Sequence, residues 1–569
     1  MDTLNPQVLV VGSGPAGLVL ALSLAQNGIP LRIIEKRSEF HQSQRGAGVQ
    51  PRSIELYNFL GLYDEIKAGS IPLLPVRNYK LPGGTEVESV VTLAASIDLA
   101  PDVPYPNPLM IGQDHAESIL RSHLAKLGIQ VERSTELVSF QQDLNGVTAE
   151  ILKRSDDDKE IRETARFDFL VGADGARGVS RKQLGLTFLG EPTSHHSLIG
   201  DVFVKGLTAD VFHNWRPSDS KEMLVLRPTE IEGLFYIFLS TANPADYQKI
   251  SASKENLQAF INATTNRDDI IIESIRTLAE FRPSVRMVNK FGEGRVFVVG
   301  DAAHVHSPAG GQGMNSSIQD SFNLAWKLSL VCRKVSPLSI LDTYSDERLP
   351  VIQDMLAKTV EVHKKMLQGL KNKDVQAAWD RPKSLNQLRV NCRWSSILVD
   401  EQVEDHEGAK AIARDAYGSE TDDQLRAGDR APDAPGLVNI RSNEKTSLFS
   451  IFKPTYHTAL LLNPPDLPAL IEAFTHWPSG TVKVVMVLPQ GGSLTMDLPE
   501  YVAVLEDREG HAYQSYKKIV NGGFHVGMIR PDGVIGGIAR GTKGVDTYQK
   551  KLFAMKFVFL GQKSSSSID

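Results

Sequence analysis

The chain has 569 residues, of which 41% are hydrophobic and 23% are charged, and its formal net charge is −6. A chain of this length is too long for one hydrophobic core, so two or three domains are expected. The apolar fraction is that of an ordinary globular protein, and the slightly acidic charge gives no electrostatic reason to bind nucleic acid or an acidic membrane.

The first residues predict a strand, a tight turn and a helix. Residues 8–11 form an apolar run typical of a buried parallel strand, and residues 18–26 have a helical pattern. The turn between them contains Gly12, Gly14 and Gly17 in GxGxxG spacing. The first glycine permits the turn, the second lets the backbone approach a pyrophosphate, and the third lets the helix lie close to the strand. The amides at the start of the helix would point at the phosphates.

An acidic residue follows the next apolar strand. Residues 31–34 form that strand and Glu35 ends it, where an acid would accept hydrogen bonds from ribose hydroxyls. The complete pattern predicts dinucleotide binding, whereas the three glycines alone would also fit a turn without a ligand. It does not distinguish FAD from NAD.

Two later stretches of the sequence distinguish FAD from NAD, because they resemble those of a known family. They are FDFLVGADGARGVSR around Asp174 and RVFVVGDAAHVHSPAGGQGMNSSIQDSFNLAWKL around Asp301. In order and sequence, these stretches and the N-terminal unit resemble the FAD-dependent aromatic hydroxylases, which are single-component flavoprotein monooxygenases. In that family the aspartate equivalent to Asp301 hydrogen-bonds the ribityl chain of FAD. The helix from residue 316 would direct its positive end at the flavin edge that is negative when reduced.

The resemblance implies a set of FAD-binding residues. Arg45 lies where the family has an arginine beside the flavin, and Gln113 lies at a helix start that contacts the ribityl chain or phosphates. Asp174 belongs to a motif that touches FAD and helps to position the reduced pyridine nucleotide. The implied FAD-binding residues are Gly12, Gly14, Pro15, Ala16, Gly17, Glu35, Lys36, Arg45, Gln113, Asp174, Gly300, Asp301, Pro308, Gly311, Gly313, Met314 and Asn315.

Other matches to the family say less about the reaction. Arg52 and Arg121 fit the pattern of arginines near the cofactor. Tyr344, Glu347 and Arg348 resemble a Y-x-x-E-R signature that we expect to serve packing rather than chemistry.

The expected fold class is α/β, with a Rossmann-type FAD-binding domain interwoven with a mostly antiparallel β-sheet substrate domain. Alternating runs such as SLIGDVFVKG and GLFYIFLS predict that sheet. The C-terminal part resembles the thioredoxin-like α/β domain of phenol-hydroxylase-type enzymes, but it has no CxxC motif. The predicted boundaries are 1–80, 105–190 and 285–400 for the FAD-binding domain, 81–104 and 191–284 for the substrate domain, 401–425 for a linker and 426–569 for the thioredoxin-like domain.

The resemblance implies an enzyme that uses NADPH or NADH and O₂ to hydroxylate a small aromatic, first of all phenolic, substrate through a flavin C4a-hydroperoxide. No catalytic base is assigned, because residues 47–49 are Ala-Gly-Val where related phenol hydroxylases often carry an acid. The candidates for a direct part in catalysis are Arg45, Tyr236 in the run LFYIF, and Pro308 in the loop over the flavin.

Other functions stay open on the sequence alone. A Baeyer–Villiger or epoxidising monooxygenase would use the same flavin chemistry, and a non-catalytic FAD-binding redox sensor would need no substrate. The chain has only two cysteines, Cys332 and Cys392, which excludes a disulfide-coupled flavoprotein reductase. No zinc-ligand spacing is present, and no metal is expected.

The sequence also indicates where the protein works. The longest apolar run, residues 18–25, is too short to cross a bilayer, and no signal peptide is recognised. Low cysteine content indicates a reducing compartment, so we expect a cytoplasmic protein with no membrane partner. We expect the C-terminal domain to pack against the rest or to form a homodimer, and residues up to about 400 to bind FAD without it.

Overall fold

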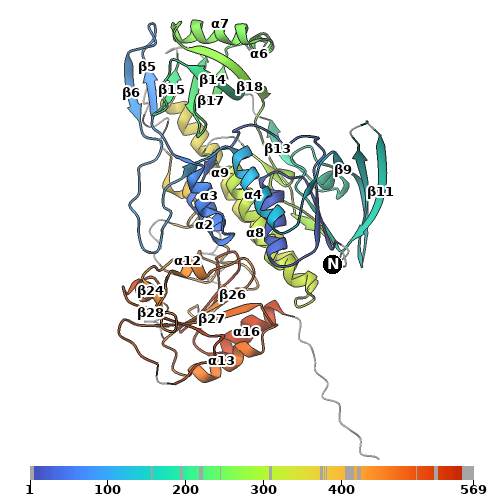
Figure 1. The fold of residues 1–569 in the computed structure, drawn as a ribbon, viewed down its shortest axis with the longest axis vertical. Helices are drawn as coiled ribbons and strands as arrows, with labels where there is room; N and C mark the ends of the chain where they lie inside the picture. Colours follow the sequence, from blue (N-terminus) through green and yellow to red (C-terminus); the bar gives the residue numbers. More distant parts are fainter. Residues whose placement is uncertain are drawn as a thin grey trace, which may run out of the picture.

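The structure is a computed structural model with three parts stacked along its long axis (Figure 1). A β-sheet capped by α6 (Asp246–Ser251) and α7 (Lys254–Thr265) lies at one end, long helices and a parallel sheet lie in the middle, and a second α/β unit lies at the other end. The described residues are 6–155, 157, 159–192, 196–216, 222–243, 245–306, 310–371, 376, 379, 381–403, 415–419, 424–494, 496–517, 519, 523 and 525–553.

The central part is built on a six-stranded sheet with a parallel core, as the strand–turn–helix pattern predicts. Its strands in spatial order are β20 (Gly292–Glu293), β21 (Val296–Val298), β12 (Phe169–Gly172), β1 (Val8–Val11), β2 (Leu31–Ile34) and β8 (Val131–Glu132). Only β20 runs antiparallel to its neighbour. Its helices are α1 (Pro15–Gln26), α2 (Pro51–Phe59), α3 (Tyr63–Ala68), α4 (Gln113–Lys126), α5 (Val179–Gln183), α8 (Gly313–Cys332) and α9 (Asp342–Lys371).

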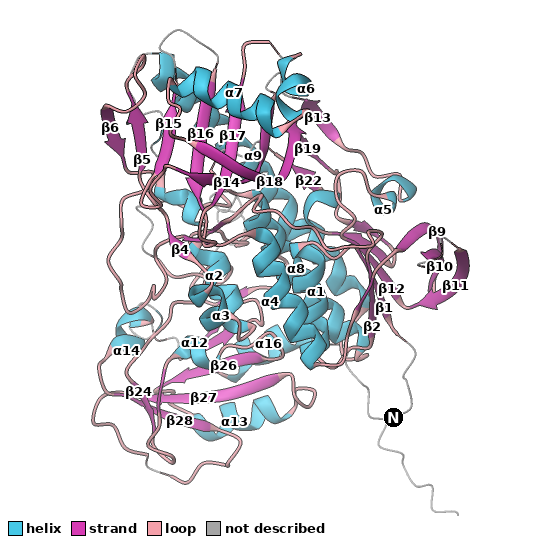
Figure 2. Ribbon diagram, turned by 45° about the horizontal axis from the view of Figure 1, so that its top comes forward, coloured by secondary structure: helices cyan, strands magenta, loops and turns pink. Residues whose placement is uncertain are grey.

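Small antiparallel sheets flank this core. The one formed by β9–β11 projects to one side in Figure 2. The strands of the three small sheets are β9 (Thr135–Asp143), β10 (Gly146–Arg154) and β11 (Glu160–Phe167); β13 (Leu189–Pro192), β19 (Ser284–Met287) and β22 (His304–Val305); β3 (Gly48–Val49), β7 (Leu109–Met110) and β4 (Ile71–Pro72).

The sheet at the capped end has seven strands and is antiparallel except between β15 and β5, which agrees with the predicted mostly antiparallel sheet. Its strands are β18 (Ile271–Phe281), β14 (Ser197–Lys205), β17 (Leu234–Ser240), β16 (Met223–Pro228), β15 (Phe212–Trp215), β5 (Val76–Tyr79) and β6 (Val87–Val91). Strand β5 precedes residue 81, where the sequence placed the start of this domain. One face packs an apolar core against α6 and α7, and the other faces the central part.

The C-terminal unit is an eight-stranded mixed sheet with helices. Its strands are β23 (Val399–Asp400), β30 (Ile535–Ala539), β29 (Val526–Ile529), β26 (His457–Leu462), β27 (Val482–Leu488), β28 (Ala503–Asp507), β24 (Leu437–Asn439) and β25 (Lys445–Thr446), and its helices are α12 (Leu448–Ile451), α13 (Leu467–Thr475), α14 (His511–Ser515) and α16 (Thr542–Leu552).

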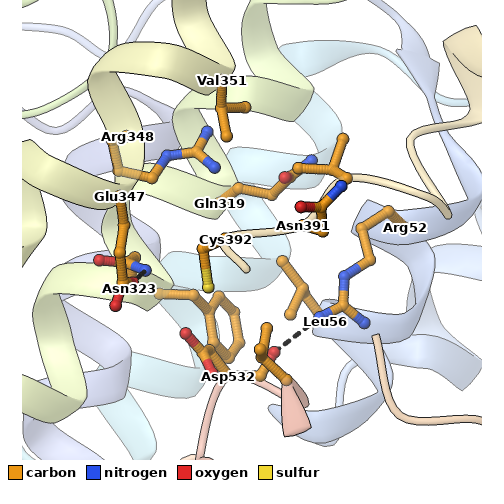
Figure 3. Close-up of a pocket in the computed structure, with 13 residues that line it drawn as sticks. Arg52, Leu56, Gln319, Asn323, Glu347, Arg348, Val351, Asn391, Cys392 and Asp532 are labelled. Atoms are coloured by element: carbon orange, nitrogen blue, oxygen red, sulfur yellow. Dashed lines mark hydrogen bonds between the residues drawn. The ribbon is translucent and has the colours of Figure 1, made fainter. Parts of the chain in front are cut away.

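A buried group of charges joins the C-terminal unit to the long helices. The carboxylate of Glu347 on α9 accepts two hydrogen bonds of 2.9 Å from the Arg530 guanidinium and one of 3.0 Å from Lys327 on α8. None of the three side chains is exposed to solvent. Figure 3 shows the adjoining pocket, where Asp532 lies opposite the helix residues. Burial alone would raise the pKa of Glu347, but the charges of Arg530 and Lys327 hold it well below its ordinary value.

A second buried carboxylate reinforces this junction. Glu55 on α2 lies 2.7 Å from Arg52 and 2.6 Å from Arg430, and Arg52 also donates to the backbone carbonyl of Asp532. The apolar core is continuous across the same boundary. The expectation that residues up to about 400 bind FAD alone therefore changes, because cutting there would strip Arg430 and Arg530 from buried carboxylates. Within the described residues, no helix is both long and apolar enough to span a membrane.

We expect Arg530→Met to lower the free energy of unfolding by about 3–5 kcal/mol, because it leaves the buried Glu347 carboxylate without its main counter-ion. Thermal unfolding and urea titration measure this loss. The control is Arg508→Met, which removes the exposed partner of Glu506 and should leave the free energy of unfolding nearly unchanged. Equal stabilities of the two variants would contradict the importance of the buried group.

Candidate active site

Four polar or glycine positions from distant parts of the sequence meet at one edge of the parallel sheet. Gly12 follows β1, Glu35 follows β2, Asp174 lies just after β12, and Asp301 lies just after β21. The carboxyl ends of adjacent parallel strands lie together, so these residues border one cleft. The sequence motifs thus converge in space as predicted.

The glycine turn is shaped by close backbone packing. Gly12 has a φ of +105°, and a Cβ there would lie 2.4 Å from the carbonyl oxygen of Ala173. A Cβ on Gly17 would lie 2.0 Å from the carbonyl oxygen of Gly12. Around Gly14, by contrast, no atom lies within 4 Å of the Cβ position. The turn therefore leaves open space directly in front of the N-terminus of α1, where an anionic group is stabilised.

Glu35 is held against this turn. One carboxylate oxygen accepts from the backbone amide of Ser13 at 3.2 Å and from its hydroxyl at 3.1 Å, and the other accepts from the amide of Arg37 at 3.1 Å. Lys36, the next residue, is exposed. A carboxylate fixed beside this open turn suits the hydroxyls of a nucleotide ribose.

A polar face of helix α4 lines another side of the cleft. Gln113 donates to Glu117 at 2.8 Å, and one nitrogen of Arg121 is buried without a hydrogen bond in the described residues, 3.6 Å from Glu117. Burial raises the pKa of Glu117. Arg45 enters from a loop residue with a φ of +38°. Arg121, a weaker match in the sequence, thus lies in the cleft, whereas Arg52 lies at the C-terminal junction.

The charges of Asp301 and Arg45 act on each other. Asp301 is accessible to solvent, yet the surrounding protein raises the pKa of its carboxyl, with the charge of Arg45 acting in the opposite direction. Desolvation likewise lowers the pKa of Arg45, and the carboxylates of Glu117 and Asp301 oppose that change. A charged pair that is accessible but poorly hydrated is typical of a deep binding cleft.

The turn that carries Asp301 is fixed by a buried carboxylate on α8. Asp320 accepts from His304 at 2.7 Å, from the guanidinium of Arg348 at 2.7 Å and from the amide of Gly300 at 3.3 Å. Burial alone would raise the pKa of Asp320, but Arg348 and His304 bring it below its ordinary value. Tyr344 donates to the carbonyl of Val298 at 3.0 Å. Tyr344, Glu347 and Arg348 therefore serve packing, as expected.

Residues 310–315, around the start of α8, are packed against neighbouring segments. Helix α8 begins at Gly313, three residues before the predicted start at 316. A Cβ on Gly313 would lie 2.4 Å from the His306 ring, and the first-turn amides have no acceptor within the helix. Asn315 donates to the carbonyls of Gly48 and Gly311 at 2.9 and 2.8 Å, so its side chain joins the loop to β3.

Two other residues near the start of α8, Met314 and Pro308, were predicted from the sequence to bind FAD. Met314 is half-buried in the first turn of α8, whereas Pro308 lies outside the described residues.

Asp174 offers an unused acceptor to the cleft. One of its oxygens accepts from the amide and hydroxyl of Ser180 at 2.9 and 3.0 Å. The other oxygen is buried and has no hydrogen-bond partner in the described part of the chain. Gly178 gives it room, since a Cβ there would lie 2.1 Å from the carboxylate. The open turn at Gly14, the free oxygen of Asp174 and the orphaned nitrogen of Arg121 all fit a large polar ligand.

One face of the seven-stranded sheet lies over the cleft, as its roof, and carries a row of residues that are neighbours across adjacent strands. In spatial order the row is Phe212, Arg227, Tyr236, Asp201 and Thr277. Asp201 accepts from the amide of Gln44 at 2.9 Å, which connects the roof to the loop carrying Arg45. Burial raises the pKa of Tyr236 to about 12, so its phenol is protonated at neutral pH and is not a base.

Sequence reasoning found Tyr236 but missed Arg227, Asp201 and Glu117. The available signal was a charged residue inside an apolar strand run, as in MLVLRP and LIGDVFV. Among the described residues, no group of three or more His, Cys, Asp or Glu side chains could hold a metal ion.

Comparison with known proteins shows the family of this chain. Residues 5–359 match the family described as FAD binding domain. A flavin-dependent monooxygenase of Mycobacteroides abscessus is 32% identical over 499 residues, covering 85% of this chain and 95% of that protein. Pentachlorophenol 4-monooxygenase of Sphingobium chlorophenolicum is 30% identical over 546 residues, covering 93% of each.

Solved structures share the fold over nearly the whole chain. The flavin-dependent monooxygenase PieE, in complex with FAD and substrate, aligns with a TM-score of 0.76 at 21% identity, covering 97% of this chain and 99% of that one. Aklavinone-11 hydroxylase with FAD and aklavinone aligns with a TM-score of 0.75 at 23% identity, covering 97% and 100%.

We expect Asp320→Asn to destabilise the protein by about 3–5 kcal/mol, because the buried Arg348 loses its counter-ion. The folded-state pKa of Asp320 lies below its ordinary value of 3.8, so its contribution is complete above that pH and is lost as the pH falls below it. Urea unfolding at neutral pH and at a pH well below 3.8 should therefore show a difference between wild type and variant that shrinks in acid. The exposed Asp497→Asn is the control, and a pH-independent difference would contradict the assignment.

Proposed function

The chain belongs to the FAD-binding-domain family of flavin-dependent monooxygenases, and we propose that it hydroxylates a small aromatic substrate with NADPH or NADH as electron donor and O₂ as oxidant. The observation that carries this proposal is the convergence of Gly12, Glu35, Asp174 and Asp301 at one sheet edge, opposite Arg45. Pentachlorophenol 4-monooxygenase among the relatives, and the solved structures named aklavinone-11 hydroxylase and CabE, an aromatic hydroxylase, support ring hydroxylation, with a phenol as the first expectation.

FAD is held, in this proposal, across the whole cleft. The Gly12–Gly17 turn and the start of α1 receive the pyrophosphate, and Glu35 accepts the ribose hydroxyls. Asp301 accepts from the ribityl chain. The full set of FAD-binding residues is the one proposed from the sequence, with the backbone rather than the side chain of Asn315 available to the cofactor.

The protein around the cofactor supplies charge and exclusion of water. When bound, FAD supplies the redox chemistry, taking a hydride from the nicotinamide and delivering one oxygen atom of O₂ to the substrate. The N-terminus of α8 and the Arg45 guanidinium would hold the flavin and would supply positive charge to stabilise its reduced form. An apolar cluster containing Ala47, Met110 and Phe212 keeps water from the substrate side.

No side chain is proposed as the base. Ala47 and Val49 are buried, with Gly48 between them in β3, so this segment offers no acid. Tyr236 holds its proton and acts as a hydrogen-bond donor to the substrate. The roofed cleft supports an enzyme over a redox sensor, and the hydroxylase relatives support hydroxylation over Baeyer–Villiger oxidation or epoxidation.

The C-terminal unit is proposed to be a thioredoxin-like domain with a packing role. Parallel β26 and β27 joined by α13, followed by the β29–β30 hairpin and α16, support this proposal. The proposed boundaries follow those predicted from the sequence, with β5 moved to the substrate domain. Both cysteines are buried and free, which fits a reducing, cytoplasmic location. A homodimer remains part of the proposal.

We expect Asp301→Ala to bind FAD about tenfold to a hundredfold more weakly, because a charged hydrogen-bond acceptor contributes about 1.5–3 kcal/mol. The ratio of visible to ultraviolet absorbance of the purified protein and titration of the apoprotein with FAD measure this change. The exposed Asp497→Ala should retain wild-type affinity. Full FAD occupancy of Asp301→Ala would contradict the ribityl assignment.

We expect phenolic compounds to stimulate NADPH or NADH oxidation by the FAD-loaded protein and to gain one ¹⁸O atom under ¹⁸O₂. Mass spectrometry of the products measures both the oxygen count and the intactness of the ring. Ring-expanded or epoxide products would favour the other monooxygenase chemistries, and no stimulation by any aromatic would favour the sensor.

A further inference from the structure

A small polar cavity lies at the junction of the long helices and the C-terminal unit, between α2, α8, α9 and the turn that joins β29 to β30 (Figure 3). Its volume is about 40 Å³, whereas one water molecule needs about 10–15 Å³ of such space. None of the described candidates for FAD binding lines it. The cavity is therefore a separate feature of the fold, with room for about three water-sized groups.

Two arginines in its wall have unused donors. Arg52 on α2 and Arg348 on α9 are each 4% exposed. Arg52 donates its two terminal nitrogens to Glu55 and to the carbonyl of Asp532, at 2.7 Å each. Arg348 donates its Nε to Asp320 at 2.7 Å and its Nη2 to a backbone carbonyl at 3.4 Å. The Nε of Arg52 and the Nη1 of Arg348 have no hydrogen-bond partner in the part of the chain that the structure describes.

Both of these nitrogens reach the cavity. Neither is among the fully enclosed polar atoms that lack a partner, so each touches accessible space. Because both side chains line the cavity and are otherwise buried, that space is the cavity itself. Figure 3 shows Arg348 on one side of the pocket and Arg52 on the other. A guanidinium stays charged at ordinary pH and has no acceptor atoms, so these N–H groups need an acceptor from elsewhere.

The charge of Arg52 is only partly neutralised. The Glu55 carboxylate lies 2.7 Å from Arg52 and also 2.6 Å from Arg430, so two cations share one negative charge. The charges of Asp102 and Asp433 act on Arg430 as well. Among the described residues, neither makes an ion pair with Arg430 and neither lines the cavity. Positive charge therefore remains at the cavity wall.

The carboxylates in the cavity wall are already occupied. Glu347 accepts two hydrogen bonds from Arg530 and one from Lys327. Asp532 accepts from the Nε of Arg530 at 3.0 Å. The other acceptor in the wall is the side-chain oxygen of Gln319, which has no donor among the described residues. The protein thus supplies no negative group to the two open arginine nitrogens.

We propose that this cavity binds a small monovalent anion of halide size between Arg52 and Arg348, with a water molecule between the anion and Gln319. Hydrogen bonds from charged donors to an anion are among the strong ones, and they would satisfy both open N–H groups. The volume excludes a nucleotide or an aromatic ring. Since Arg348 belongs to α9 and Arg52 also bonds Asp532, the bound anion would strengthen the contact between the long helices and the C-terminal unit.

The first test is thermal unfolding of the FAD-loaded protein in sodium chloride and sodium gluconate at constant ionic strength. Gluconate is too large for the cavity. An anion that binds only the folded state raises stability with its concentration. We expect Tm to rise by about 2 °C between chloride-free buffer and about 100 mM chloride, along a saturating curve. No rise in wild type would overturn the inference.

The second test locates the anion. Crystals of the FAD-loaded protein grown in sodium bromide should show an anomalous diffraction peak inside the cavity, in contact with the Nε of Arg52 and the Nη1 of Arg348. A cavity that holds only water, or bromide peaks only at other places such as the FAD cleft, would overturn the inference.

Two variants assign the chloride response to the cavity. Arg52→Gln should abolish it, and because Glu55 keeps Arg430 as its partner the protein should still fold. Val351→Ile narrows the cavity without changing any charge and should also abolish the response. Arg508→Gln removes the same charge at an exposed site and should respond as wild type. A full chloride response in Arg52→Gln and Val351→Ile would contradict the proposed site.

Discussion

The Asp320 carboxylate is the interaction on which the geometry of this cleft depends. It lies in the middle of α8, a helix buried along nearly its whole length, and is not exposed to solvent. Buried in this way, a carboxylate must be paired or it becomes protonated. Its pairing with Arg348 and His304 fixes α9 and the turn after β21 to α8 in one arrangement. Asp301, on that turn, therefore faces the cleft from a rigid support.

A buried carboxylate is also paired with an arginine where the C-terminal unit meets the long helices. Glu347 lies one residue before Arg348, so adjacent positions of α9 point into two separate buried ion groups. One group orders the cofactor cleft and the other requires Arg530 from the last unit. The C-terminal unit thus contributes to the active site through charge compensation at α9 rather than by contact with the cleft.

A buried carboxylate also links the seven-stranded sheet to the loop that carries Arg45. Asp201 in the substrate sheet holds the amide of Gln44, and Arg45 follows directly in the chain with a left-handed backbone. A substrate that moves this sheet would therefore also move Arg45, whose charge acts on Asp301. Positive charge from Arg45 and the start of α8 lies in a site whose proposed cofactor is negative when reduced.

Local patterns in the sequence predicted the parts of this site that depend on neighbouring residues. The Gly12–Gly17 turn, the strand that ends at Glu35 and the Gly300–Asp301 turn have short-range signatures, and the structure has them where they were expected. Arg52 and Arg227 could not be assigned this way, because their roles depend on partners far along the chain. Arg52 matched the family pattern but bonds the carbonyl of Asp532, and Arg227 looked like one charge in an apolar strand until the sheet register placed it beside Tyr236.

A crystal structure of the FAD-loaded protein tests the account most directly. The account predicts the flavin ring between Arg45 and the start of α8, and the ribityl chain at Asp301. Density for FAD away from the edge of the parallel sheet that carries Gly12, Glu35 and Asp301 would contradict it.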